Sequence, residues 1–76
     1  MKTGSGERYA RLSQLMTEAR KKSGLSQQEV ADRLGRPQTY VSRVERGTRQ
    51  MDLVEFLEIA EAIGFDPAEF VRNLKA

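Results

Sequence analysis

Residues 27–46 read QQEVADRLGRPQTYVSRVER, and this stretch decides how the rest of the chain can fold. Ser26, just before it, is followed three residues later by Glu29, which is the pattern of a capping box at a helix start. Gly35 suits a turn that needs a positive φ angle, because glycine has no Cβ to clash there. Pro37 suits the start of a new helix, since its missing N–H would have no partner at that position. The stretch therefore predicts two short helices joined by a tight turn.

The apolar residues of the same stretch indicate that its two helices pack on each other. Ala31 falls where the helices would cross, and only a small side chain fits there. The contacts between the helices would come from Val30, Leu34, Val41 and Val44. This arrangement is typical of a helix-turn-helix, whose second helix enters the major groove of DNA.

Helical spacing continues on both sides of this motif. It predicts a first helix over about residues 8–22, a third over about residues 38–45 and a fourth over about residues 52–63, with a short fifth helix capped by Asp66. The fourth helix carries an apolar stripe, and the fifth helix holds three further apolar residues. The stripe consists of Leu53, Phe56, Leu57, Ile59, Ala60 and Ile63, and the fifth helix holds Phe70, Val71 and Leu74.

The domain organisation follows from these helices. Alternating strand patterns and hairpin turns are nearly absent, so we predict an all-α chain. Residues 1–7, which are small and polar, are expected to form a flexible N-terminal segment, and residues 8–76 to form one domain with the helix-turn-helix at about residues 27–46.

The composition argues against several classes of protein. The 76 residues include no cysteine and no histidine, so the chain lacks the usual zinc ligands and the commonest general base. No apolar run approaches the ~20 residues of a membrane helix, and no export leader is evident. We therefore expect a cytoplasmic protein without metal, cofactor or enzymatic activity, and without contact to a membrane.

The charges are unevenly distributed along the chain. Residues 1–50 carry 11 basic and 5 acidic residues, a net charge of +6, whereas residues 51–76 carry 2 basic and 6 acidic residues, a net charge of −4. A basic half that is rich in arginine is a candidate surface for the phosphates of nucleic acid.

The stretches GLSQQEVADRLG (24–35) and QTYVSRVERG (38–47) together resemble the helix-turn-helix of the phage lambda repressor and Cro-type (Xre-like) family. LVEFLEIAEAIGFDPAEF (53–70) resembles the fourth and fifth helices of that family. The resemblance covers about residues 12–74 and implies a five-helix bundle of the lambda-repressor-like DNA-binding domain type. It also implies a sequence-specific transcriptional regulator, a repressor that binds a palindromic operator in double-stranded DNA and is nucleoid-associated when bound.

The predicted third helix carries the expected reading face. On a helical wheel, its polar residues lie opposite Val41 and Val44. A polar helix face alone is most often an ordinary solvated surface, but within a helix-turn-helix it favours contact with base edges. The residues expected to read bases are Gln38, Thr39, Ser42 and Arg43, and those expected to bind phosphates are Gln27, Arg36, Tyr40, Arg46, Arg49 and Arg20.

Two features come from the comparison with the resembling repressors. There, an arginine on the first helix pairs with a glutamate at the end of the third, which implies a structural ion pair between Arg20 and Glu45 here. Members of the family often have serine or threonine where this chain has Pro37, and proline cannot supply the side-chain cap of the recognition helix.

The partners are less sharply defined. One recognition helix contacts few base pairs, so a homodimer is expected, with Phe65, Phe70, Val71 and Leu74 either pairing the two copies or simply closing the core. Glu55, Glu58, Glu61 and Glu69 are expected to be exposed, and they could contact RNA polymerase. The alternative function is an antitoxin-like or adaptor module that uses the same fold to bind a protein such as a toxin.

Overall fold

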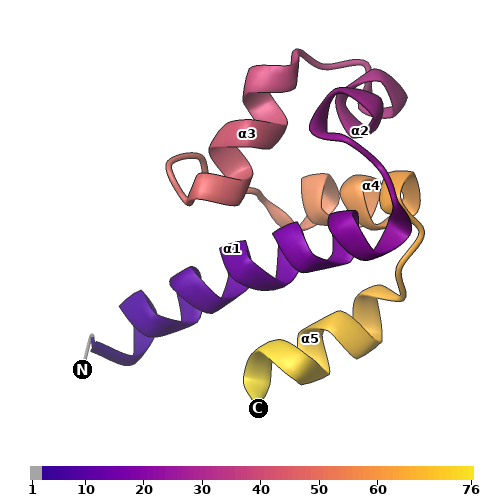
Figure 1. Ribbon diagram of the computed structural model, residues 1–76. Coiled ribbons are helices and arrows are strands. Elements are labelled where there is room, and N and C mark those ends of the chain that lie inside the picture. The colour runs from indigo at the N-terminus through magenta and orange to yellow at the C-terminus, as the bar shows by residue number, and fades with distance from the viewer. Residues whose placement is uncertain (1–2) are drawn as a thin grey trace.

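The computed structural model describes residues 3–76, which form five α-helices and no strand (Figure 1). The all-α, five-helix prediction is confirmed. The helices are α1 (Thr3–Ser23), α2 (Gln27–Leu34), α3 (Gln38–Arg46), α4 (Leu53–Ile63) and α5 (Pro67–Lys75).

The start of α1 differs from the prediction. The helix begins at Thr3 rather than at Arg8, so the part of the expected flexible segment that the structure describes is helical. Gly4 and Gly6 lower helix propensity, but they do not block a helix as proline does. The helix can therefore extend towards the N-terminus from the residues with high helix propensity that follow. Residues 1 and 2 of the expected segment lie outside the described residues.

The helix ends agree with the sequence signals. Ser26 and Glu29 form the predicted capping box, and Gly35 ends α2 with a φ angle of 68°. Asp52 caps α4 with a second box, in which Glu55 bonds back to the Asp52 N–H. Pro37 precedes α3 without any side-chain cap, as its chemistry requires.

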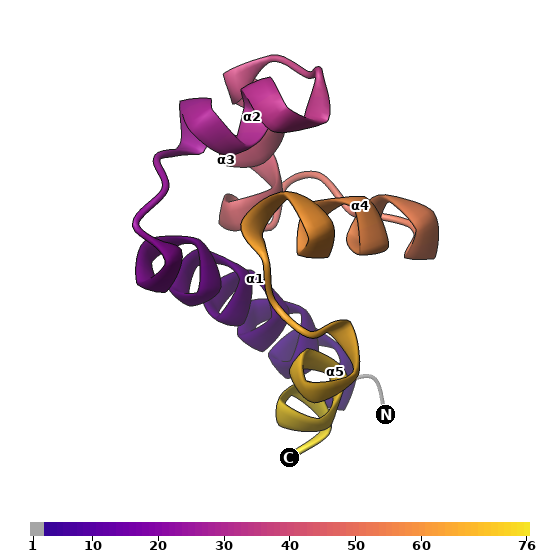
Figure 2. The ribbon, with the colours of Figure 1, turned by 90° about the vertical axis from the view of Figure 1, so that its right-hand side faces the viewer.

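The core takes buried side chains from all five helices. Met16 of α1 is almost fully buried, and Val30, Ala31, Val41 and Val44 of the helix-turn-helix pack in the same cluster. The helix-turn-helix and α5 occupy opposite ends of the molecule, as both views show (Figures 1 and 2). No helix within residues 3–76 is both long enough and apolar enough to cross a bilayer.

The predicted core of α4 is correct only in part. Phe56, Ile59, Ala60 and Ile63 are buried, and the ring of Phe56 packs on Phe65 and Phe70. Two leucines of the same apolar stripe are exposed instead: Leu53 is 71% exposed and Leu57 42% exposed. The rotation of α4 about its own axis turns Phe56 into the core and leaves these leucines outside it.

Candidate nucleic-acid interface

The two sides of α3 differ as the helical wheel predicts. Val41 and Val44 are buried, whereas Thr39, Arg43 and Arg46 are exposed and Gln38 and Ser42 are half-buried. Among residues 6–76, whose side chains the structure describes, no hydrogen bond or ion pair engages the side chains of Thr39, Ser42, Arg43 or Arg46. Their hydrogen-bonding groups are therefore available to a partner.

A chain of polar side chains connects the beginning of α3 to the scaffold. Gln38 donates from Nε2 to Oε1 of Gln27 in α2. Gln27 in turn donates from Nε2 to Oε1 of Glu45, at 2.9 Å. Arg20 of α1 completes the chain, since its Nε lies 2.7 Å from Glu45 Oε2 and its Nη2 lies 3.0 Å from Glu45 Oε1. Hydrogen bonds through Glu45 and Gln27 thus connect the side chain of Gln38 to Arg20 on α1.

The chemistry of this chain determines how the Gln38 amide is oriented. An ionised carboxylate only accepts hydrogen bonds, so Glu45 requires Gln27 to turn its amide nitrogen inward and its oxygen towards Gln38. Gln38 must then donate to that oxygen. Its own Oε1 and its second Nε2 hydrogen are left free, so one donor and one acceptor are presented side by side.

The predicted ion pair between Arg20 and Glu45 is present. The two side chains are 11% and 5% exposed, and the remaining Nη1 of Arg20 donates to the Leu25 carbonyl oxygen at 2.9 Å. The hydrogen bond to Glu45 raises the pKa of Arg20. Because all three nitrogens of the guanidinium group have partners within the protein, this arrangement favours a structural role for Arg20 over the additional phosphate contact that we predicted.

The same pair makes stability depend on pH. Burial alone raises the pKa of Glu45, but its bonds with Arg20 and Gln27 outweigh burial and bring the pKa below its ordinary 4.5. A lowered pKa in the folded state stabilises the protein at pH values above the unfolded pKa, and this stabilisation is lost as pH falls through the folded pKa. We therefore expect the urea midpoint to hold from about pH 7 to about pH 5 and to fall at lower pH. Glu45→Gln should flatten the acid limb, and an equally steep limb in that variant would contradict the assignment.

A second cluster surrounds Tyr40, which is only 8% exposed. The guanidinium carbon of Arg36 lies 4.3 Å from the ring centroid, and that of Arg49 lies 5.0 Å from it. Both arginines also pair with Glu55, Arg36 at 3.3 Å and Arg49 at 2.9 Å. Burial raises the pKa of Tyr40, and the hydrogen bond from Arg49 lowers the pKa of Glu55.

This cluster corrects one expectation and qualifies another. Glu55 is not a free acidic residue, because it closes the α4 capping box and holds two arginines, whereas Glu58, Glu61 and Glu69 are exposed as predicted. Arg36 and Arg49 keep 37% and 39% of their side chains exposed, so their outer N–H groups remain open to a phosphate.

The chain belongs to a known family of proteins. The family described as "Helix-turn-helix domain" matches residues 11–72. A solved structure described as an XRE-family like protein from Pseudomonas syringae pv. tomato is 42% identical, with a TM-score of 0.92 over 97% of this chain and 90% of that one. The chain is a member of the XRE-like, Cro/C1-type helix-turn-helix family.

Two further relatives support this membership. An HTH-type transcriptional regulator of Sinorhizobium fredii, y4dJ, is 38% identical over 66 residues, which are 87% of this XRE-like chain and 77% of the relative. The restriction-modification controller protein C.AhdI from Aeromonas hydrophila is 37% identical, with a TM-score of 0.75 over 82% of this chain and 90% of that one.

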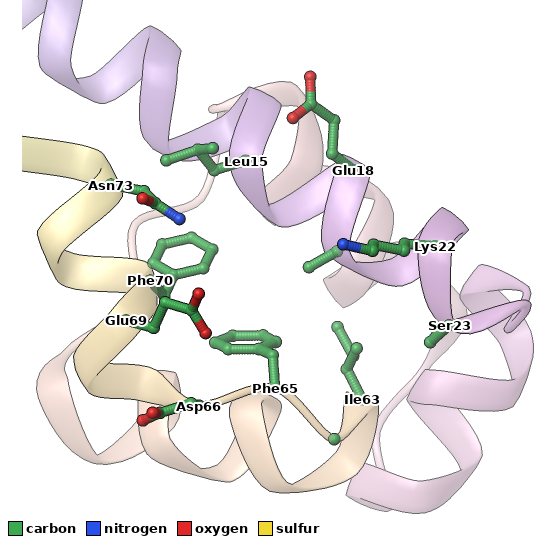
Figure 3. Close-up of a pocket in the computed structure, with 12 residues that line it drawn as sticks. Leu15, Glu18, Lys22, Ser23, Ile63, Phe65, Asp66, Glu69, Phe70 and Asn73 are labelled. Carbon is green, nitrogen blue, oxygen red and sulfur yellow. The ribbon is translucent and has the colours of Figure 1, made fainter. Parts of the chain in front are cut away.

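An open depression of about 440 Å³ lies between α1 and the segment that joins α4 to α5, and no residue of α3 lines it. Phe65 and Phe70 line it, and the ring of Phe70 lies between Leu15 and the ring of Phe65 (Figure 3). Phe70 is 7% exposed and stacks on Phe65 at 4.9 Å between ring centroids. Of the two roles predicted for Phe70, pairing two copies or closing the core, its burial in this XRE-like domain favours closing the core.

The rest of that predicted dimer surface has a mixed placement. Leu74 is half-buried and lies with Leu12 and Tyr9 of α1 around a second depression. Val71 is 42% exposed and is the one residue of the four that offers substantial free apolar surface.

Sequence reasoning missed two parts of this interface. The bond between Gln27 and Gln38 joins residues of different helices, and no spacing in the sequence predicts it. The grouping of Arg36, Tyr40 and Arg49 around Glu55 also went unpredicted, although Asp52 and Glu55 stand at the spacing of a capping box. That spacing indicates that Glu55 turns back towards the start of α4.

Proposed function

We propose that this protein is a repressor that binds a palindromic operator as a homodimer, in the cytoplasm and on the nucleoid. As a member of the XRE-like family it is a DNA-binding regulator of transcription. The observation that carries the finer proposal is the exposed side of α3. There Gln38 is held in a fixed orientation, while Arg43 has no side-chain partner among residues 6–76. A rigid polar group beside a free arginine suits direct reading of base edges.

The reading residues differ in what they offer to a base pair. The free oxygen and N–H of Gln38 match N6 and N7 of adenine, and the guanidinium group of Arg43 matches O6 and N7 of guanine. Thr39 is exposed and presents a methyl group that suits thymine, with Ser42 as a neighbouring hydroxyl. Each good bidentate pair discriminates against a wrong base by ~1–3 kcal/mol.

Phosphate contacts would set the position of α3 in the groove. Arg46 is exposed at the end of α3, and Arg36 and Arg49 flank the helix with guanidinium groups stacked on Tyr40. Stacking restricts these arginines, so less side-chain entropy is lost when a phosphate binds. Gln27 lies at the first position of α2, where free backbone N–H groups favour an anion.

The proposal of a dimer rests on the number of base pairs that must be read to select one DNA site. A single helix in the groove reads too few base pairs to select one site among many, and two-fold symmetric pairs bind half-sites about one helical turn apart. The similarity to a restriction-modification controller protein supports a regulator of this kind. A dimer bound over a promoter represses by excluding RNA polymerase.

The test is selection of binding sites from a randomised duplex library, followed by anisotropy titrations of the selected site and of scrambled DNA at several salt concentrations. An inverted repeat bound at least ~10³-fold more tightly than scrambled DNA is the expected result. Weak binding without any selected sequence would mean that only the basic surface acts, and would refute the operator proposal.

A further inference from the structure

Glu55 is an acidic residue among side chains that are expected to bind phosphates. Its carboxylate pairs with two arginines from different parts of the chain. Arg36 comes from the turn between α2 and α3, and Arg49 from the segment between α3 and α4. A carboxylate repels phosphates, so a negative charge at this place opposes the binding of any DNA. Its presence there calls for a role other than raising affinity.

The carboxylate of Glu55 is fully occupied by hydrogen-bond donors. Its Oε2 accepts from Nη2 of Arg49 at 2.9 Å and from Nη2 of Arg36 at 3.3 Å. Its Oε1 accepts from Nη1 of Arg49 at 3.2 Å and from the backbone N–H of Asp52 at 3.0 Å. A carboxylate has about four acceptor sites, and all of them are used here. Glu55 thus holds both guanidinium groups in place relative to the first turn of α4.

The same arrangement limits the positive charge that this part of the surface presents. Arg36 and Arg49 carry two positive charges, and Glu55 offsets one of them. The two guanidinium carbons lie 4.3 Å and 5.0 Å from the centroid of the Tyr40 ring, so two like charges stack on the same ring. Without the carboxylate between them, the two groups would repel each other and move more freely.

We propose that Glu55 is a specificity-determining residue, which weakens binding to random DNA more than it weakens binding to the operator. This inference rests on the proposed function, in which Arg36 and Arg49 contact phosphates beside the reading helix. Glu55 acts through these two arginines and touches no DNA itself, so it is a positioning residue.

The operator complex tolerates Glu55 because its geometry is fixed. When α3 reads one sequence, it takes one position in the groove, and the phosphates near Arg36 and Arg49 then also have fixed positions. Arginines that Glu55 and Tyr40 already hold in place lose little conformational freedom when they meet those phosphates. This advantage offsets part of the repulsion between Glu55 and the DNA.

Complexes with random DNA lack that advantage. Binding without sequence preference depends on the charge that the protein presents to the phosphates. Free arginines could follow whichever phosphates are nearest, whereas arginines held by Glu55 cannot, and the carboxylate repels the phosphates in every register. Glu55 therefore raises the ratio of operator affinity to random affinity, although it lowers both affinities.

Glu55→Gln separates the charge of this residue from its role at the start of α4. Glutamine closes a capping box as glutamate does, so its oxygen can keep the bond from the Asp52 N–H. Its amide nitrogen then stands where Oε2 now accepts from Arg36 and Arg49, and an amide nitrogen cannot accept from a guanidinium group. The variant should keep its fold, as circular dichroism will verify, while both arginines are released.

The experiment is anisotropy titration of the full chain, as wild type and as Glu55→Gln, with the selected operator and with scrambled DNA at several salt concentrations. We expect Glu55→Gln to bind scrambled DNA about 5- to 10-fold more tightly, and the operator at most about 2-fold more tightly. The salt dependence on scrambled DNA should steepen by about one phosphate contact. An unchanged affinity ratio, or weaker binding to both DNAs, would overturn the inference.

Glu58→Gln is the matched control, because it removes the same charge from the same helix. Glu58 is exposed about one turn beyond Glu55 and pairs with no side chain of residues 6–76. We expect this variant to leave the affinity ratio unchanged. An equal fall of the ratio in Glu58→Gln would show that only net charge matters, and would refute a special role of Glu55.

A second control tests whether Glu55 acts through the two arginines. In a protein that already carries Arg36→Ala and Arg49→Ala, Glu55→Gln should produce no further fall in the affinity ratio. A fall as large as in the wild-type background would contradict the inference. A wild type that prefers the operator while Glu55→Gln keeps the full ratio would refute the inference alone. A wild type with no preference for any sequence would refute the proposed function and the inference with it.

Discussion

Arg20→Ala should lower the free energy of unfolding by about 3–5 kcal/mol, the largest effect on stability that we expect from one substitution. The Glu45 side chain is 5% exposed, and without Arg20 its carboxylate would lose both guanidinium hydrogen bonds and its opposite charge, while the bond from Gln27 would remain. A nearly buried charge without its partner cannot regain the hydration that it lost on folding, which is why breaking such a pair is so costly. Urea denaturation followed by circular dichroism measures the change, and the variant should unfold at a clearly lower urea concentration.

Two control variants test whether the loss of stability comes from leaving a buried charge without its partner. Arg49→Ala also breaks an ion pair, but Arg49 is 39% exposed, so water can replace its partner and the loss of stability should be much smaller than that of Arg20→Ala. The double variant Arg20→Met with Glu45→Leu should recover most of the stability, because no unpaired charge remains. An Arg20→Ala protein as stable as the wild type would show that the pair does not hold α3 on α1.

The features that could be predicted from the sequence are those decided locally. The capping box at Ser26, the turn at Gly35 and the uncapped start at Pro37 depend only on residues within one helical turn of each other. The two sides of α3 follow from the 3.6-residue period, since Val41 and Val44 mark the buried direction. The pairing of Arg20 with Glu45 came instead from the resemblance to known repressors, because the two residues are 25 positions apart.

The features that were missed depend on how the helices are rotated against each other. Periodicity places Leu53, Leu57 and Phe56 in one apolar stripe, but the rotation of α4 buries Phe56 and leaves the leucines exposed. Glu55 was expected to be solvated, whereas the same rotation brings it to Arg36 and Arg49. A stripe wider than the available core always leaves one edge outside, and the sequence of a single helix does not say which edge.

Arg43→Ala should weaken binding to the selected operator by about 10- to 100-fold per half-site and relax the preference at one base pair. Arg43 is exposed and has no partner among the side chains of residues 6–76, so the protein itself should keep its stability. The loss should therefore come from the missing bidentate contact to guanine. Anisotropy titrations against the operator, its single-base variants and scrambled DNA measure the affinity and the preference together.

Arg46→Ala is the matched control, because Arg46 is also exposed on α3 but is assigned to the phosphates. Its loss should weaken operator and scrambled DNA alike, leave every base preference in place and lower the salt dependence by about one phosphate contact. Arg43→Lys adds a second control, since lysine keeps the charge but not the planar fork that guanine requires. If Arg43→Ala and Arg46→Ala weakened all sequences equally, Arg43 would be a phosphate ligand, and the reading of bases would depend on Gln38 and its neighbours Thr39 and Ser42. If Arg43→Lys restored full preference, charge rather than geometry would determine the choice of base.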